Sequence, residues 1–363
     1  MNRKTTEVAA TLLGLALVAA LPSTATAVQQ ESSTATVNPS TTGVAAGGDL
    51  ALSGAVKPAD VRTVELQRLL GDTWVDFQKV TTDDQGRYAA NVPTTMFVGT
   101  AKYRAVAQED GQYAEARSDA VTVAIRPQGK SAAHTYLLSP LDTQPYRWDP
   151  CAPVQVRVNP AGAPAGYLKD IHGAIDRINA QSGLRLRYAG ETGIVPRSRQ
   201  ESYPDGTDLV VAFVYPGQTD YFPKGSGAAG FGGARGSYKY DAQGHHTAPK
   251  LSTGFVVLKR SLYKELDAGF TAGKKYGWNG TRGQLLMHEI GHAVGMGHAN
   301  LDKAEIMYPA MQDHAAVWGA GDAANLGALG IASGCVDQTQ LLAARTAVRR
   351  VVTSTHSVAG VLD

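Results

Sequence analysis

The stretch from residue 288 to residue 298 reads HEIGHAVGMGH and concentrates side chains that can bind a metal ion. His288 and His292 are four residues apart. On an α-helix this spacing places two side chains about 40° apart around the axis and about 6 Å apart along it. Neutral imidazole is a preferred ligand of Zn²⁺ at roughly 2.0–2.1 Å, and two imidazoles on one face can reach the same ion. The pair therefore predicts a zinc site on a helix.

Three further residues of this stretch favour a catalytic site. Glu289 lies about 100° around the helix from His288, where its carboxylate can accept a proton from a water molecule at the ion. Gly295 allows the chain to turn sharply, so that His298 can return as a third ligand. Three protein ligands leave a fourth position open for water, which is typical of catalytic zinc. One catalytic Zn²⁺ is predicted, and a structural Ca²⁺ is not, because the chain has no calcium-loop spacing.

The elements that must position these residues follow from the pattern of apolar residues. Thr281 and Gln284 match a helix capping box just before the histidines. The glycine-rich stretch 225–237 fits either a flexible loop or a strand that passes close to another element. This order of elements is typical of an α+β fold with helices packed on a mixed sheet. Apolar periodicity predicts strands at 154–158, 184–188, 208–214 and 254–258 and a helix at 166–181.

The pattern HExxHxxGxxH from His288 to His298 resembles the zinc signature of the metzincin metalloproteases. The sequence Met-Tyr-Pro at 307–309 resembles the methionine turn of the matrixin branch of that family. The stretch GAGDAANLGALG around Asp322 resembles the last helix of that branch. The resemblance covers roughly residues 146–335 and implies a zincin-type catalytic domain.

This resemblance implies a role for each residue of the motif. His288, His292 and His298 would bind the zinc ion, and Glu289 would be the general base of a peptide-bond hydrolase. Met307 would pack beneath the ligands. Protein or peptide substrates would lie extended beside an edge strand of the sheet.

The resemblance also implies a substrate pocket, although the chain departs from the matrixin pattern. Tyr308 and Pro309 would wall the pocket for the side chain just past the scissile bond. Ala299 stands where a serine is typical after the third histidine. No cysteine precedes Cys151, so the propeptide cysteine that keeps animal matrixins latent is absent. Matrixin-like is therefore the better description.

Residues 1–27 are expected to be a signal peptide. A short basic start is followed by an apolar stretch from Val8 to Leu21 and by small residues that fit cleavage after Ala27. That stretch is too short to span a membrane comfortably. The formal net charge of +2 predicts no nucleic-acid partner. We expect a secreted monomer, exported by a Sec-type signal and without a membrane partner.

Two domains are predicted after the signal peptide. Residues 28–47, rich in Ser, Thr and Gly, are expected to be a flexible lead-in. Residues 48–126 contain short alternating stretches separated by turn residues, which predicts an all-β sandwich. The order Trp74, Tyr88, Tyr103 resembles the immunoglobulin-like modules appended to many bacterial exported enzymes. The rest of the chain is expected to comprise a linker at 127–145, a metzincin-like zinc peptidase domain at 146–338 and a C-terminal tail at 339–363.

The two cysteines, Cys151 and Cys335, are most simply a disulfide in an exported chain. Their wide separation argues against a shared structural zinc site, which uses closely spaced thiolates. The polar pair His245-His246 fits a loop better than a second metal site.

Other interpretations of the histidine motif stay open. The three histidines can be buried polar residues satisfied by hydrogen bonds, or the domain can hold zinc without activity. A second functional hypothesis is an exported binding or adhesion protein, in which the sandwich is the working part and the zinc domain is inert.

Overall fold

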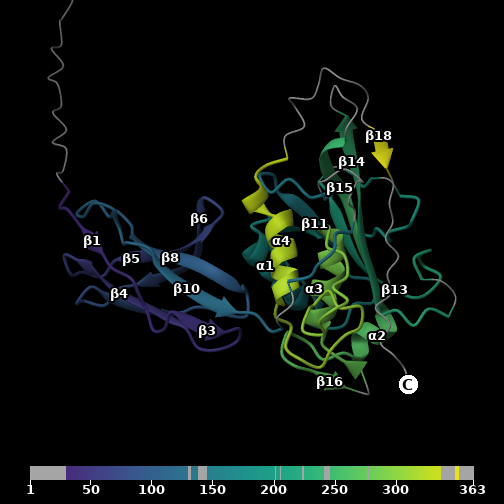
Figure 1. The fold of residues 1–363 in the computed structure, drawn as a ribbon, viewed down its shortest axis with the longest axis horizontal. Coiled ribbons are helices and arrows are strands. Elements are labelled where there is room, and N and C mark those ends of the chain that lie inside the picture. The colour runs from purple at the N-terminus through teal and green to yellow at the C-terminus, as the bar shows by residue number, and fades with distance from the viewer. Residues whose placement is uncertain are drawn as a thin grey trace, which may run out of the picture.

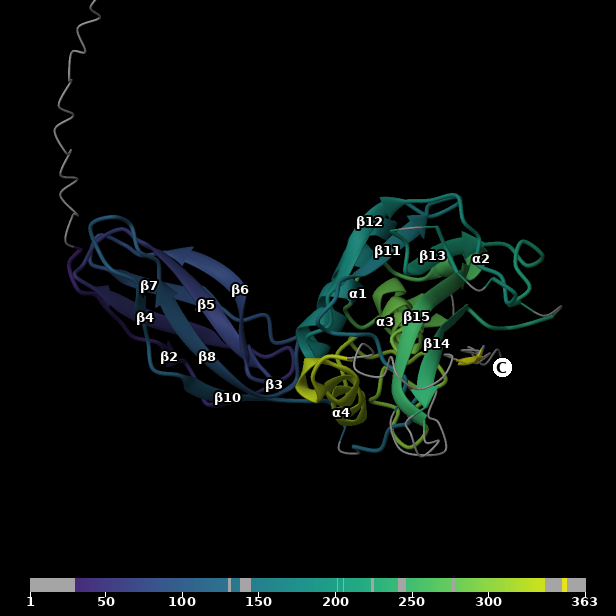
Figure 2. The same cartoon turned by 90° about the horizontal axis from the view of Figure 1, so that it is seen from above.

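The computed structural model describes residues 30–129, 132–137, 145–200, 202–204, 206–222, 225–240, 246–275, 278–336 and 348–350. The predicted signal peptide and most of the predicted tail lie outside these ranges. Figures 1 and 2 show two domains side by side, a β-sandwich and an α+β domain. Among the described residues, no helix is long and apolar enough to cross a membrane.

The first domain consists of two β-sheets that face each other (Figure 2). Its core is built from alternating strand residues such as Val64 and Leu66, both fully buried. The first sheet has β4 (Ala51–Lys57) at its centre, paired with β1 (Thr34–Ala35), β2 (Asn38–Pro39) and β7 (Arg87–Asn91). The second sheet runs in the order β3 (Gly43–Ala45), β10 (Val121–Arg126), β8 (Gly99–Ala107), β5 (Thr63–Leu70) and β6 (Thr73–Thr81), with β9 (Ala116–Arg117) beside β8.

The prediction of a flexible lead-in at 28–47 is wrong from residue 30 onward. β1 and β2 pair with β4, and β3 pairs with β10 in parallel, so this segment contributes strands to both sheets. These strands are only two or three residues long. An alternating pattern cannot become visible over so few residues, which is why the composition suggested a loop instead.

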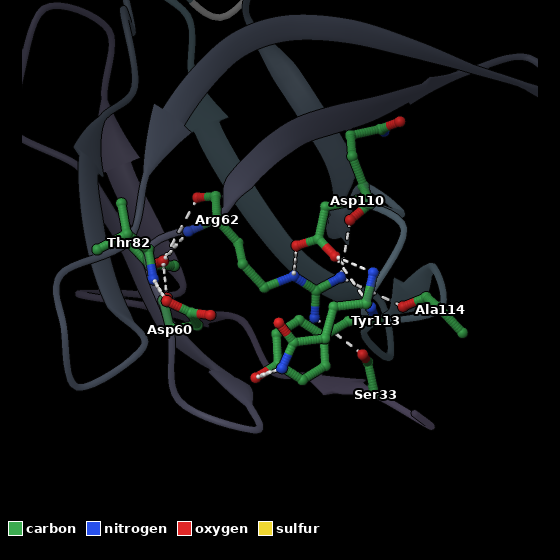
Figure 3. A network of polar contacts seen from close by, with 10 residues as sticks. Ser33, Asp60, Arg62, Thr82, Asp110, Tyr113 and Ala114 are labelled. Carbon is green, nitrogen blue, oxygen red and sulfur yellow. Dashed lines mark hydrogen bonds and ion pairs between the residues drawn. The ribbon is translucent and has the colours of Figure 1, made fainter. Parts of the chain in front are cut away.

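Buried Arg62 anchors the same segment to the sandwich (Figure 3). Its guanidinium donates to the Ser33 hydroxyl at 2.8 Å and to the backbone carbonyl of Gln108 at 2.7 Å. Its Nε lies 3.3 Å from the carboxylate of Asp110. The cation therefore ties the residue just before β1 to the loop between β8 and β9.

The second domain is built on a mixed sheet, which confirms the predicted α+β class. β12, β11, β13 and β15 are parallel, whereas β14 runs antiparallel to β15. The short strand β18, which falls within the predicted tail, pairs with the outer edge of β14. The sheet order is β12 (Leu186–Glu191), β11 (Val154–Asn159), β13 (Leu209–Val214), β15 (His246–Lys259), β14 (Gly230–Tyr240) and β18 (Val348–Arg350).

Three helices gather on one side of this sheet (Figure 1). They are α1 (Tyr167–Ser182), α3 (Arg282–Ala293) and α4 (Ala320–Leu329), and α1 contacts both of the others. α1 buries Ile171, Ile175 and Ile178 on one face and ends at Gly183, whose φ of 72° suits a left-handed cap. Shorter elements are α2 (Arg260–Glu265), the 3₁₀ turn Ile331–Ser333 and the pair β16 (Lys274–Lys275) and β17 (Trp278–Asn279).

Residues 230–237 of the glycine-rich stretch 225–237 form most of β14. Of the two predicted alternatives, a flexible loop or a strand that passes close to another element, the strand is therefore the correct one. A Cβ at Gly232 would overlap the backbone carbonyl of Glu289 on α3. A Cβ at Gly233 would lie 2.7 Å from the ring of Phe255. Glycine therefore lets the strand approach the helix that carries the histidine motif.

The domain boundary predicted at residue 146 is also wrong, because part of the predicted linker belongs to the second domain. Among residues 132–137, the backbone N–H of Leu137 donates to the carbonyl of Gly295 at 2.8 Å. Residues 138–144 lie outside the described ranges. A further contact joins the domains directly, since the Gln181 side chain accepts from Val98 N at 2.9 Å and donates to Val98 O at 3.1 Å.

The predicted disulfide between Cys151 and Cys335 is confirmed, with a Cα–Cα distance of 5.4 Å. Nearby, the Arg147 guanidinium donates to the carbonyl of Gly334 at 2.6 Å, and Asp149 accepts from Val336 N at 3.2 Å. The disulfide and these bonds fix the end of the α+β domain to its beginning.

Candidate metal centre

Helix α3 places two of the predicted ligands on one face. Thr281 caps its first turn by accepting from Gln284 N at 3.3 Å, which is one half of the predicted capping box; among the described residues, the Gln284 side-chain oxygen has no hydrogen-bond partner to complete the other half. His288 and His292 are both buried, and their Nε2 atoms lie 3.1 Å apart. The four-residue spacing thus brings the two imidazoles together.

A turn after α3 brings the third predicted ligand back toward the first two. Gly295 has a φ of 110°, a conformation that strongly favours glycine. Beyond it, the ring centroid of His298 lies 5.3 Å from that of His288 and 4.8 Å from that of His292. Within this cluster, one ligand atom from each histidine lies within 4.8 Å of the others.

Backbone carbonyls orient two of the three imidazoles. His288 Nδ1 lies 2.7 Å from the carbonyl oxygen of Ile306, and His292 Nδ1 lies 2.8 Å from that of Met296. A carbonyl oxygen only accepts hydrogen bonds, so each Nδ1 carries the proton. In the neutral imidazole the lone pair that can bind a metal ion is then on Nε2. The Nε2 atoms of His288 and His292 face each other.

This donor set fits zinc. Two ligands at roughly 2.0–2.1 Å from one tetrahedral ion lie about 3.3 Å apart, close to the observed 3.1 Å between the Nε2 atoms of His288 and His292. Three imidazoles are a known ligand set of catalytic zinc. The Nδ1–carbonyl bonds are the outer contacts that usually orient metal-binding histidines.

Met307 packs directly beneath the histidine helix. It is buried, and its sulfur would lie 2.7 Å from a Cβ at Gly291, the residue just before His292. The backbone carbonyl of Met307 accepts from Ala299 N at 2.9 Å. This contact joins the methionine turn to the residue that follows His298.

Two acidic residues that sequence reasoning did not assign to the site hold this turn in place. Asp322, in the first turn of α4, accepts from Ile306 N at 2.6 Å and from Met307 N at 3.1 Å. Glu305 accepts from the backbone of Gly321 at 3.0 Å and of Asp322 at 2.7 Å. Burial and the neighbouring Glu305 raise the pKa of Asp322 well above its usual value, although the backbone N–H donors oppose the shift.

Glu289 is fully buried and faces strand β14. A Cβ at Gly230 would lie 2.7 Å from Glu289 Oε1, so glycine is needed there for the carboxylate to fit. Burial raises the pKa of Glu289 well above its usual value, and the backbone N–H of Gly232 opposes this shift.

The remaining predicted site residues lie next to this cluster or apart from it. Tyr308 and Pro309 are half-buried directly after Met307, and their role as a pocket wall stays a prediction. His245 lies outside the described residues. A cavity of about 810 Å³ opens between the two domains, lined by residues such as Phe97 and Leu184 and not by the histidines.

Comparisons with known proteins leave the family open. No protein-family model matches the chain, and no curated protein is similar to it. One solved structure, from work on host cell surface retention of a 1.5-MDa bacterial ice-binding adhesin, matches 37% of this chain and 41% of that chain. The identity is 12% and the TM-score is 0.19, so this likeness carries no argument about fold or function. The resemblance to metzincins therefore rests on the residues of this chain alone.

Proposed function

We propose that the protein is a secreted zinc endopeptidase of the metzincin type, similar to the matrixin branch. The observation that carries this proposal is the convergence of His288, His292 and His298 beside Glu289. Nδ1 of His288 and of His292 is fixed by a backbone carbonyl, which suits Nε2 to bind a cation. The methionine turn beneath the histidines and the strand beside the glutamate support the same conclusion.

The chain's own residues have distinct roles in this chemistry. Zinc, when bound, supplies a Lewis acid that polarises a peptide carbonyl and lowers the pKa of water toward 7. The three histidines hold it in their neutral form. Glu289 would accept at its carboxylate a proton from the water that attacks the peptide carbonyl, and would pass it to the amine that leaves as the C–N bond breaks.

Strand β14 provides an edge along which a peptide substrate can bind. Within the part of the chain that the structure describes, β18 pairs with residues 236–238 of β14, and no strand pairs with the outer edge from Gly230 to Arg235. Gly230 and Gly232 lie against Glu289. An extended peptide that adds to this edge would be carried past the glutamate, with its main chain held by β-type hydrogen bonds.

The proposed setting is outside the cell. A signal peptide at residues 1–27 and the disulfide are both typical of exported proteins. The partners are then protein or peptide substrates, and the enzyme acts as a monomer, with Tyr308 and Pro309 lining the pocket beyond the scissile bond.

Cleavage of an unstructured protein such as casein by residues 28–363 tests the proposal. Glu289→Gln is expected to lower turnover by about 10²–10⁴-fold because the general base is lost. Its zinc content should stay that of the wild type. Glu109→Gln, at an exposed position of the sandwich, is the matched control and should cleave normally. A zinc chelator should abolish cleavage by the wild type.

Equal turnover by the wild type and by Glu289→Gln would contradict the proposed role of this residue. Zinc binding without cleavage of any tested protein would instead favour the alternative, an exported binding or adhesion protein whose zinc domain is inert.

A further inference from the structure

Residues 132–137, within the predicted linker, run alongside the loop that carries the third histidine. The carbonyl of Gly295 accepts from Leu137 N at 2.8 Å, and the carbonyl of Thr135 accepts from Gly297 N at 2.7 Å. Tyr136 forms an antiparallel bridge with Met296. We call this segment the strap.

Thr135 links the strap to the third histidine itself. Its hydroxyl donates to the backbone carbonyl of His298 at 2.8 Å. Its own carbonyl also accepts from the side-chain amide of Asn325 on α4 at 2.7 Å. A Cβ at Gly297 would lie 2.9 Å from the carbonyl oxygens of Thr135 and Tyr136, so glycine allows this close approach.

The three histidines differ in what holds their backbone. His288 and His292 lie within α3, where regular helical hydrogen bonds fix their positions. His298 lies beyond the end of the helix, in a stretch without regular secondary structure. The strap contacts the backbone at three places in that stretch, namely Gly295, Gly297 and His298.

We propose that the strap is part of the metal centre and that Thr135 is a positioning residue for His298. The inference rests on the zinc site of the proposed function but not on peptidase activity. Contacts one step removed from a metal typically change metal affinity by 10–100-fold when they are lost, because they orient the ligands. The chain that leaves the sandwich therefore also completes the site, and a sandwich-free enzyme needs residues from 132 onward to bind zinc tightly.

Zinc affinity measured by competition with a chromophoric chelator tests this inference on the full chain. Thr135→Val keeps the shape of the side chain but removes the hydroxyl, and the zinc Kd is expected to rise by about tenfold. Thr135→Ser keeps the hydroxyl and should restore the wild-type Kd. Thr122→Val, at an exposed position of β10, is the control for the same exchange elsewhere.

A double-mutant cycle separates positioning from general destabilisation. If Thr135 acts through His298, then Thr135→Val should have no effect on the zinc Kd in a His298→Ala background. The same weakening in both backgrounds, or an unchanged Kd in the single variant, would overturn the proposal.

A second variant keeps the test decisive if Thr135→Val does not fold. Asn325→Asp removes the donor to the Thr135 carbonyl and should also weaken zinc binding, whereas a wild-type Kd in that variant would overturn the role of the strap. A wild-type chain that binds no zinc would contradict the proposed function itself, which is a distinguishable outcome.

Discussion

Each domain of the protein contains a buried polar cluster, and the two clusters are built differently. In the sandwich, the Arg62 guanidinium donates to Ser33 and to the carbonyls of Gln108 and Ala114, while its Nε pairs with Asp110 (Figure 3). The carboxylate of Asp110 and the hydrogen-bond acceptors therefore compensate the charge of the buried guanidinium. Such a cluster stabilises a fold and needs no ligand.

The cluster in the α+β domain brings groups of the same kind together. With both Nδ1 atoms donating to carbonyls, the Nε2 atoms of neutral His288 and His292 are both acceptors, and they lie 3.1 Å apart. Two lone pairs gain nothing from facing each other, whereas a cation between them attracts both. Burial of a polar group can serve the fold alone, as at Arg62, whereas two facing imidazole acceptors favour a cation between them.

Removal of a proposed zinc ligand should have the largest effect, and this effect should be confined to zinc binding. His292→Ala takes away one of the two facing imidazoles, so the zinc Kd should rise by more than about 100-fold, beyond the usual effect of losing an outer contact. The sandwich should keep its stability, as measured by hydrogen exchange of residues 30–126. Tight zinc binding by this variant would show that the histidines are not the site.

Removal of the sandwich cation should have a smaller effect, which falls on the stability of the sandwich and not on zinc binding. Arg62→Met leaves part-buried acceptors without their donor, so we expect the sandwich to lose about 2 kcal/mol of stability, seen as faster hydrogen exchange. The zinc Kd should not change. Arg87→Met, which breaks an exposed ion pair with Asp83, is the matched control and should have little effect. Weaker zinc binding in Arg62→Met would mean that the clusters are not independent.

The smallest expected effect concerns the acidic pair that holds the methionine turn. Burial raises the pKa of both Glu305 and Asp322, so the folded chain binds more protons than the unfolded chain above their usual pKa of about 4. This contribution to stability is present at low pH and is lost as the pH rises through the raised pKa values.

Replacement of Glu305 tests this sign. Glu305→Gln removes one acidic group and its charge beside Asp322, so the free energy of unfolding should fall less steeply with rising pH than in the wild type. Urea denaturation at a series of pH values measures the two slopes, and identical slopes would contradict the assignment.

Local spacing made the central part of the site predictable. The four-residue spacing of His288 and His292 and the cap at Thr281 are both features of the single helix α3. They can therefore be recognised in one short stretch of sequence. Gly295 indicated the turn toward His298 because few other residues adopt its backbone conformation.

Contacts between distant parts of the chain could not be predicted in the same way. Thr135 and His298 are 163 positions apart, and neither local sequence indicates the hydrogen bond between them. The sequence does not identify strand β14, because glycines carry no side chain and no apolar alternation marks the strand. Gly230 and Gly232 are explained only by the packing of α3 against them.

The zinc content of the purified full chain after dialysis against zinc-free buffer tests whether the three histidines form a metal centre. We expect one tightly bound zinc ion per chain, lost in the His292→Ala variant and retained in Glu289→Gln. A wild-type chain without zinc, even after incubation with the ion, would contradict a metal centre at the three histidines.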